Sequence, residues 1–315
     1  MVFLLLLVFV GILLYLLYTL LKCLLFFKLV NFKKSSYEAS FKRLQENGYD
    51  IGSWKNRMEK NTFSISVSKQ AVINGNYIYG DSSKVAVFLH GFNQTKWDMV
   101  AHADYFYQNN FTLVFFDFRR CGTSSGISNS LGGVELADFK KVMHYINGQF
   151  PLTKELYLVG HSLGASVASI YAPYDLRVKY LVLDSLYSSA RELIKSYIIN
   201  LPLIAYIVNR ITEDMGELLA IYPKFSIQDI NPKYSLARTT MPCLLLHSDK
   251  DKKIDPSLAL SVYQKRYKIA PTQIYFSKKA TSGDLVFTDR DKYLTLLEDF
   301  FKADYRQTSF SKILY

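Results

Sequence analysis

Residues 160–164 read Gly-His-Ser-Leu-Gly, and the sequence on either side makes this short pattern specific. An apolar, β-rich run at residues 156–159 precedes it, and the small-residue start of a helix at residues 165–170 follows it. A turn this sharp from strand to helix needs glycine where a Cβ atom would clash. It also exposes the serine hydroxyl above the sheet. The pattern therefore predicts Ser162 as a nucleophile.

Short apolar runs alternate with helical patterns on both sides of this turn. The runs occupy residues 85–89, 112–116, 156–159, 180–183, 243–247 and 272–276. Upstream, an alternating stretch at residues 62–79 is interrupted by Asn74-Gly75-Asn76, which is typical of two strands joined by a tight turn. This order predicts an α/β fold: a mostly parallel central sheet with helices on both faces and one antiparallel edge. Ligands of such sheets gather at the carboxyl ends of the strands.

Composition excludes several classes of protein. Half of the 315 residues are apolar, which is incompatible with global disorder. The net charge of +11 arises from 38 Lys and Arg against 27 Asp and Glu, but nothing resembles a nucleic-acid module, so no nucleic-acid partner is expected. The three cysteines, Cys23, Cys121 and Cys243, are far apart and form no ligand cluster. No disulfide framework, metal or cofactor is therefore expected.

The N-terminus is the most apolar part of the chain. Residues 2–21 carry no charge, and at about 1.5 Å per residue such a helix crosses the roughly 30 Å hydrocarbon layer. A single membrane anchor is expected at residues 1–30. A cleaved signal peptide is the main alternative, but no basic residue precedes the run and no small-x-small pattern follows it. The lysines after the run (Lys22, Lys28, Lys33 and Lys34) favour a cytoplasmic domain, with the outer face left open.

The remaining sequence divides into a linker and a domain. Residues 31–60 are polar and are expected to form a juxtamembrane helix and linker, and residues 61–315 a single globular domain. Within that domain, residues 186–241 are too long for a simple crossover and carry apolar helical segments. We expect this insertion to be a cap, which either shields a substrate pocket from water or serves packing alone.

Two further motifs resemble the α/β-hydrolase superfamily. His90-Gly91-Phe92 follows a strand and resembles the family's oxyanion-loop motif, and residues 117–126 resemble its DxRxxGxSxG turn. The chain is most similar to membrane-anchored bacterial serine hydrolases of the serine aminopeptidase and esterase–lipase type. The resemblance implies an oxyanion hole made by the backbone N–H groups of Phe92 and Leu163. It also implies that His90, Gly91 and His161 line the site.

The same resemblance suggests the acid of a catalytic triad but not its base. In residues 247–251, which resemble the family's HGxxD, Asp251 is the expected acid, with Asp249 as the near alternative and Asp184 as a lesser one. The family order is serine, acid, histidine, yet no histidine follows Asp251. The family's histidine position matches Ser282, whose hydroxyl cannot act as a base at neutral pH. Of the histidines present, His90 is the least implausible substitute.

These observations leave two functional hypotheses. The first is a membrane-anchored serine hydrolase that acts on acyl esters or amides through Ser162, slowly because the triad histidine is missing. Its substrate would be a small acyl or lipid-like molecule. The second is a pseudoenzyme that binds a ligand or a protein partner in the capped pocket without turnover.

Overall fold

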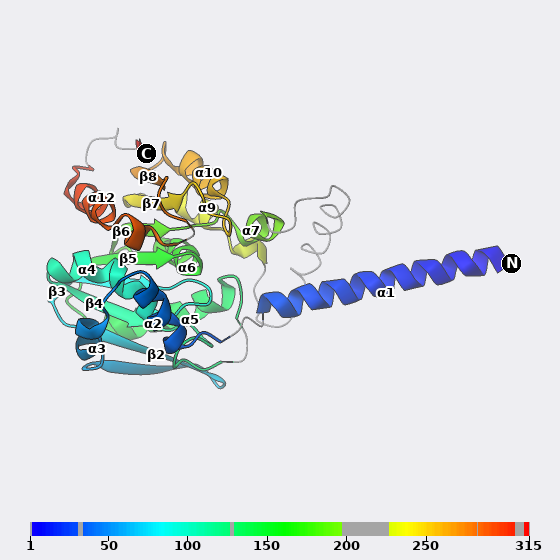
Figure 1. The fold of residues 1–315 in the computed structure, drawn as a ribbon, viewed down its shortest axis with the longest axis horizontal. Coiled ribbons are helices and arrows are strands. Elements are labelled where there is room, and N and C mark those ends of the chain that lie inside the picture. The colour runs from blue at the N-terminus through cyan, green and yellow to red at the C-terminus, as the bar shows by residue number, and fades with distance from the viewer. Residues whose placement is uncertain are drawn as a thin grey trace.

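The computed structural model describes residues 2–30, 34–126, 129–196, 227–281, 283–305 and 312–314. These residues form one sheet with helices on both faces, and a long N-terminal helix leaves the domain (Figure 1).

The sheet has the order β1-β2-β4-β3-β5-β6-β7-β8-β9. Its strands are β1 (Thr62–Ser68), β2 (Ala71–Ile78), β3 (Asp81–Leu89), β4 (Phe111–Phe116), β5 (Glu155–His161), β6 (Val178–Asp184), β7 (Cys243–Ser248), β8 (Thr272–Ser277) and β9 (Lys312–Leu314). β2 pairs antiparallel with β1 and β4, and the other pairs are parallel. The expected mostly parallel sheet with an antiparallel edge is confirmed.

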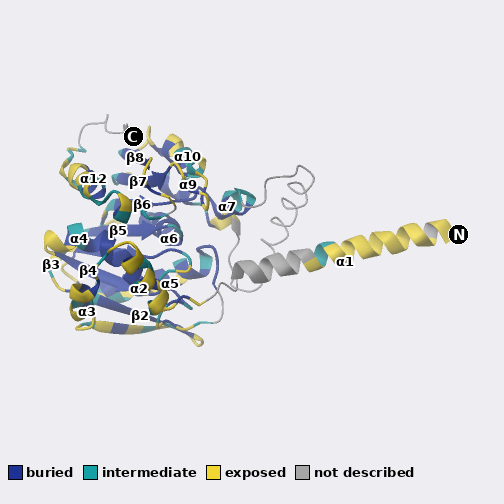
Figure 2. Ribbon diagram, viewed as in Figure 1, coloured by how far each residue is buried: buried dark blue, intermediate teal, exposed yellow. Residues whose placement is uncertain are grey.

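The two faces of the sheet bury two separate apolar cores, because successive side chains of a strand point to opposite faces. Along β3, Val85, Val87 and Leu89 enter one core, and Ala86 and Phe88 enter the other. The first core is covered by α5 (Gly133–Gln149), α6 (Leu163–Tyr171) and α10 (Pro256–Arg266), and the second by α4 (Val100–Gln108) and α12 (Arg290–Lys302). Figure 2 shows the sheet as the buried centre of the domain.

The first hairpin differs from the sequence prediction. Asn74, Gly75 and Asn76 lie inside β2, and the chain instead turns between Ser68 and Ala71. Gly75 is needed there for packing, because a Cβ atom on it would lie 2.2 Å from the ring of Phe63 and 2.5 Å from the carbonyl oxygen of Phe115. The glycine therefore reflects close approach of neighbouring strands and not a turn.

Residues 34–60 pack on the domain and do not form a free linker. They form α2 (Tyr37–Glu46) and α3 (Gly52–Met58), whose Leu44, Trp54 and Met58 are buried in the second core. The Arg43 Nε atom lies 2.8 Å from Asp98 Oδ1, and the Ser40 hydroxyl donates to Asp98 Oδ2 at 2.5 Å. The polar composition of this stretch concealed its buried face.

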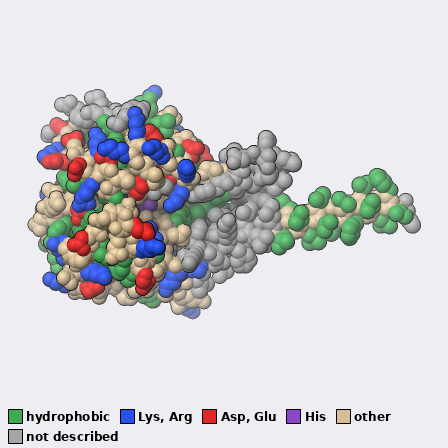
Figure 3. All heavy atoms as spheres, in the orientation of Figure 1, with side chains coloured by type: hydrophobic (Ala, Val, Ile, Leu, Met, Phe, Trp, Pro, Cys, Tyr) green, Lys and Arg blue, Asp and Glu red, His purple; other side chains and the backbone are tan. Residues whose placement is uncertain are grey.

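Helix α1 (Val2–Val30) projects away from the domain, and its described side chains are mainly apolar and exposed (Figure 3). Those side chains belong to residues 2–3 and 5–20. Over the described residues, no helix has both the length and the apolarity that crossing a membrane requires. Tyr18 of α1 packs against a small apolar cluster of the domain that includes Leu193 and Ile230.

The two ends of the expected cap are described, while its middle, residues 197–226, lies outside the described residues. The ends form α7 (Ala190–Ser196), the short turn η3 (Ile227–Asp229) and α9 (Pro232–Leu236). Leu193, Ile194 and Ile230 from these ends join Tyr187 and Ile254 in the small apolar cluster. Phe92 packs against the same cluster. Both ends of the insertion therefore lie next to the loop that carries Phe92.

Candidate active site

Ser162 occupies the sharp turn between β5 and α6. Its backbone angles are φ 50° and ψ −110°, a sparsely populated region that costs roughly 1–3 kcal/mol for a residue with a side chain. Close packing accounts for the two glycines around it. A Cβ atom on Gly164 would lie 1.9 Å from the carbonyl oxygen of Leu89, and one on Gly160 would lie 2.6 Å from Ala165 Cα. The backbone N–H of Ser162 donates to the Asp184 carbonyl at 2.8 Å.

The Ser162 side chain is half-buried, and no described residue forms a hydrogen bond with its hydroxyl. Leu163 begins α6, so its backbone N–H has no acceptor within the helix. The oxyanion loop lies against the nucleophile, because a Cβ atom on Gly91 would approach Ser162 Cβ to 3.2 Å. Ser162, Leu163 and Gly91 are thus brought together, with Phe92 next in sequence.

His90 is held by both ring nitrogens. Its Nε2 atom accepts the backbone N–H of Phe118 at 2.9 Å, so the ring proton lies on Nδ1, which donates to the Gly91 carbonyl at 2.8 Å. Complete burial lowers the pKa of His90. The suggestion that His90 replaces the missing base does not fit this geometry, because its lone pair is already used to fix the turn at Phe118.

His161 lies beneath the oxyanion loop. Its Nδ1 atom lies 2.9 Å from Gln94 Oε1, which also accepts the backbone N–H of Gly91 at 2.7 Å. Burial lowers the pKa of His161 to about 4, so the ring is neutral at physiological pH. Its Nε2 atom is buried with no hydrogen-bond partner in the described part of the chain. Sequence reasoning missed Gln94, whose only sequence signal is its position two residues after Phe92.

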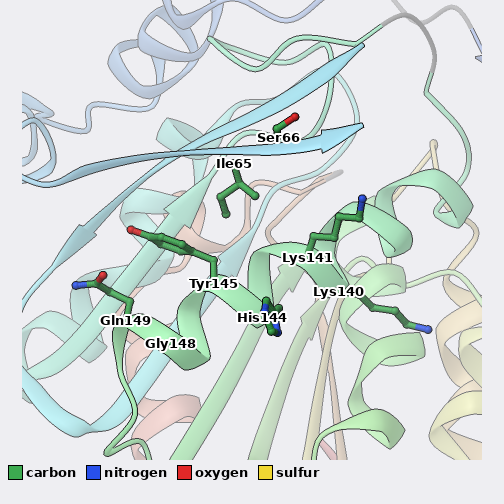
Figure 4. A pocket seen from close by; sticks show the side chains of 8 residues that line it. All are labelled: Ile65, Ser66, Lys140, Lys141, His144, Tyr145, Gly148 and Gln149. Carbon is green, nitrogen blue, oxygen red and sulfur yellow. The ribbon is translucent and has the colours of Figure 1, made fainter. Parts of the chain in front are cut away.

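The other histidines lie in structural settings. Burial lowers the pKa of His102 to about 3, and its Nδ1 atom lies 3.1 Å from the Tyr293 hydroxyl. The Nε2 atom of His247 lies 3.0 Å from the Ile254 carbonyl oxygen, and burial lowers its pKa. His144 is exposed on α5 and lines a groove of about 620 Å³ between α5 and β1 (Figure 4). None of the candidate site residues lines that groove.

Asp251 is better placed than Asp249 to orient a base. The Asp249 side chain is exposed, whereas Asp251 is buried in the loop after β7. The Oδ1 atom of Asp251 accepts the backbone N–H groups of Lys253 at 2.8 Å and Ile254 at 3.0 Å. Its Oδ2 atom is buried and has no hydrogen-bond partner among the described residues.

Asp184, at the end of the neighbouring strand β6, also has a buried carboxylate oxygen without a hydrogen-bond partner among the described residues. Its Oδ1 atom accepts the Ser185 hydroxyl at 3.0 Å, while its buried Oδ2 atom has no partner within the described ranges. Burial raises the pKa of Asp184 to about 7, and the charges of Asp251 and Asp284 add to the rise. At neutral pH this carboxyl is therefore partly protonated. Its position at the end of a strand was the sequence signal that suggested it.

Ser282 lies outside the described residues, but the residues around it are described. The Ala280 carbonyl accepts the Ser248 hydroxyl at 2.5 Å, and the Thr281 backbone N–H donates to Asp284 Oδ1 at 2.7 Å. Gly283 has φ +73° and lies against the imidazole of His161. These contacts hold both flanks of position 282 near the end of β7 and the face of β5.

Among the described residues, no group of three or more His, Cys, Asp or Glu side chains is arranged to hold a metal ion. The site that the structure describes offers a serine hydroxyl, backbone N–H groups and two buried carboxyls.

Comparison with known proteins supports the fold assignment. A family model described as the α/β hydrolase fold matches residues 85–213. The uncharacterized protein YqkD of Bacillus subtilis is 22% identical over 274 residues, which cover 85% of this chain and 88% of YqkD. The esterase Pf2001 of Pyrococcus furiosus superposes with a TM-score of 0.64 at 17% identity, over 82% of this chain and 96% of the esterase. The acylaminoacyl peptidase of Pyrococcus horikoshii gives 0.57 at 16% identity, over 82% of this chain and 44% of the peptidase.

The order of the strands, the sharp serine turn and the matching family model agree on one fold. The chain has the α/β-hydrolase fold, and its residues 85–213 match the family model of that fold.

Proposed function

We propose that this chain is a serine hydrolase that acts on acyl esters or amides through Ser162, with slow turnover because no histidine stands at the base position. The observation that carries the proposal is Ser162 itself: a strained, half-buried serine at the start of α6, packed against Gly91 of the oxyanion loop. Strain of this kind persists only where the surroundings impose it, and it clusters at functional sites.

Each neighbouring group has a role in this reaction. The Ser162 Oγ atom attacks the acyl carbon, and the backbone N–H groups of Leu163 and Phe92 stabilise the negative oxygen that forms. Asp251 orients the base, since its Oδ2 atom is a buried acceptor with no hydrogen-bond partner among the described residues and lies 3.6 Å from His247 Nε2. Ester and amide substrates are supported by the names of the similar structures, an esterase and an acylaminoacyl peptidase.

The rate is limited by proton transfer. The Ser162 hydroxyl must lose its proton as it attacks, and the leaving group must gain one. Loss of the triad histidine from a serine protease costs on the order of a million-fold in turnover. In this chain the matching position is Ser282, so we expect slow acyl transfer and not rapid hydrolysis.

Covalent labelling with a fluorophosphonate probe tests the nucleophile. We expect slow labelling of the full chain, its loss in Ser162→Ala, and unchanged labelling in Ser261→Ala, a matched control on α10. Mass spectrometry of the labelled peptide identifies the modified residue. Labelling that persists in Ser162→Ala would overturn the assignment.

A second function, a pseudoenzyme that binds a ligand or protein partner without turnover, is favoured by one observation. Both nitrogens of His90 are engaged, and His102, His161 and His247 are buried with lowered pKa values. If the full chain is not labelled while folded Ser282→His is, the native protein is such a binding protein and the nucleophile position is still correct.

We also propose that α1 anchors the domain to a membrane, with the domain on the cytoplasmic side. Support comes from the uncharged run at residues 2–21, from exposed apolar side chains such as Phe9 and Leu13, and from the lysines that follow the run. An anchor beside the domain also fits a lipid-like acyl substrate.

A further inference from the structure

Several buried polar atoms at the carboxyl ends of β5, β6 and β7 have no hydrogen-bond partner in the described part of the chain. They are His161 Nε2, Asp184 Oδ2, His247 Nδ1 and Asp251 Oδ2. A buried acceptor without a donor costs on the order of 1–3 kcal/mol, so such atoms are rare in folded proteins. Their concentration at one edge of the sheet, next to Ser162, indicates a site built to receive a donor.

The two carboxylates form the acidic part of this site. Asp184 is 3% exposed and Asp251 is 7% exposed, and β6 and β7 are neighbours in the sheet. The two groups interact, because the charge of Asp251 contributes to the raised pKa of Asp184. An N–H donor that approaches Asp251 Oδ2 would satisfy that oxygen, and positive charge that develops on the donor group would be stabilised by both carboxyls.

The spacing fits a small ring. Neighbouring strands lie about 4.8 Å apart, so the ends of β5 and β7, separated by β6 alone, lie roughly 10 Å apart. An imidazole with a hydrogen bond of about 2.8 Å at each of its two nitrogens spans most of such a gap. Its N–H would face Asp251 Oδ2, and its lone pair would face the Ser162 hydroxyl, which has no described partner.

We propose that Asp184 and Asp251 bind a nitrogen base of the imidazole class that is supplied from outside the chain, and that this base completes proton transfer at Ser162. The inference rests on the proposed function, because it assumes that Ser162 is the nucleophile. It names the missing component as a ligand and not as a residue of this chain.

The chemistry balances without an oxidant or a metal. The bound base takes the Ser162 proton while Oγ forms a bond to the acyl carbon, and the resulting cation is stabilised by Asp251. It then gives this proton to the leaving alcohol or amine as the acyl–oxygen or acyl–nitrogen bond breaks. In the second half, the base takes a proton from water as the water oxygen forms a bond to the acyl carbon. The acyl–Oγ bond then breaks, the carboxylic acid leaves, and the proton passes from the base to Ser162 Oγ.

Imidazole itself is the probe. Turnover of an unactivated alkyl ester by the full chain is measured while imidazole is titrated near neutral pH. We expect a saturable rise of at least about tenfold, absent in Ser162→Ala and reduced at least about tenfold in Asp251→Asn and Asp184→Asn. N-methylimidazole, which keeps the lone pair but has no N–H for Asp251, should stimulate less than imidazole.

A rate that rises linearly with imidazole, or equally in Ser162→Ala, would show ordinary solution catalysis and overturn the inference. Unchanged stimulation in both aspartate variants would overturn it as well. Circular dichroism melting of each variant establishes that it is folded, and Asp249→Asn, on the same loop but exposed, is the matched control. If Ser282→His gains activity while imidazole does nothing to the native chain, the proposed function stands and this inference fails.

Discussion

Gly283 lies directly against the ring of His161: a Cβ atom on Gly283 would come within 2.4 Å of His161 Nε2. Gly283 also has φ +73°, a conformation that residues with a side chain rarely adopt. The loop that carries position 282 therefore packs directly on His161, the last residue of β5. This close packing is possible because Gly283 has no Cβ atom.

This contact predicts that Gly283→Ala is destabilising. The methyl group would have to displace the buried imidazole, and the backbone would be strained, so we expect a loss of roughly 1–3 kcal/mol in the free energy of unfolding. Urea unfolding measures it. Gly148→Ala is the matched control, because no atom lies within 4 Å of a Cβ there and alanine favours the helix. Equal stability of the two variants would contradict the close contact.

Restoring the base is the direct test of the missing proton relay. In Ser282→His, the flanking contacts to Ser248 and Asp284 should hold the new imidazole beside Asp251. We expect ester turnover to rise at least about a hundredfold, which is the range of a positioned general base. The rise should vanish in the double variant Ser162→Ala/Ser282→His. A folded Ser282→His protein with unchanged turnover would mean that the base position lies elsewhere.

The mostly parallel sheet and the sharp turn at Ser162 could be predicted from sequence because both depend on local patterns. Short continuous apolar runs and one glycine–serine–glycine turn are sufficient to indicate β3 to β8. Gly75 shows the limit of this approach. Its neighbours resemble a turn, yet Phe63, twelve residues earlier, and Phe115, forty residues later, determine its role.

In the candidate site, too, some residues could be predicted from local patterns and others depend on long-range contacts. Ser162, Leu163 and Asp251 follow from motifs, but Gln94 matters only because Gly91 and His161 converge on it in space. Likewise, the engagement of His90 with the Phe118 backbone depends on how two loops meet. Long-range contacts of this kind leave no pattern in a single sequence.

Asp184 makes stability depend on pH. Its pKa is raised by burial from an ordinary value of 3.8 to about 7, so between these pH values the folded chain binds more protons than the unfolded chain. The favourable free energy that the protonated Asp184 carboxyl contributes to folding at low pH is therefore lost as the pH rises through about 7. We expect Asp184→Asn to be more stable than the native chain by a few kcal/mol above neutral pH, and the difference to shrink toward pH 4.

Urea unfolding of both proteins across this range measures the difference. Asp249→Asn, which changes an exposed carboxylate in the loop after β7, is the matched control. If the free energies of unfolding of Asp184→Asn and the native chain differ by the same amount at all pH values, the pKa of Asp184 does not change on folding.

The packing of α3 predicts that the domain begins well before residue 61. Trp54 is 2% exposed and contacts the rings of Tyr107 and Phe115. Trp54→Ala should therefore cost about 3–5 kcal/mol in the free energy of unfolding, as for other buried aromatic residues. Leu176→Ala, at a side chain that is 97% exposed, should be nearly neutral. Similar midpoints of urea unfolding for the two variants would show that residues 34–60 are a detachable linker.

A deletion variant tests whether α1 is the membrane anchor. Removing residues 2–21 takes away the uncharged run but leaves α2, α3 and the sheet intact. The shortened chain should therefore move from the membrane pellet to the supernatant after alkaline extraction, with an unchanged melting temperature and unchanged Ser162 labelling.

A matched variant replaces the same residues with an unrelated uncharged leucine–alanine sequence and should return to the pellet, because partition into the bilayer depends on apolarity and length. If the deleted chain stays with the membrane, the domain itself binds lipid; if the native chain is never in the pellet, α1 is not an anchor.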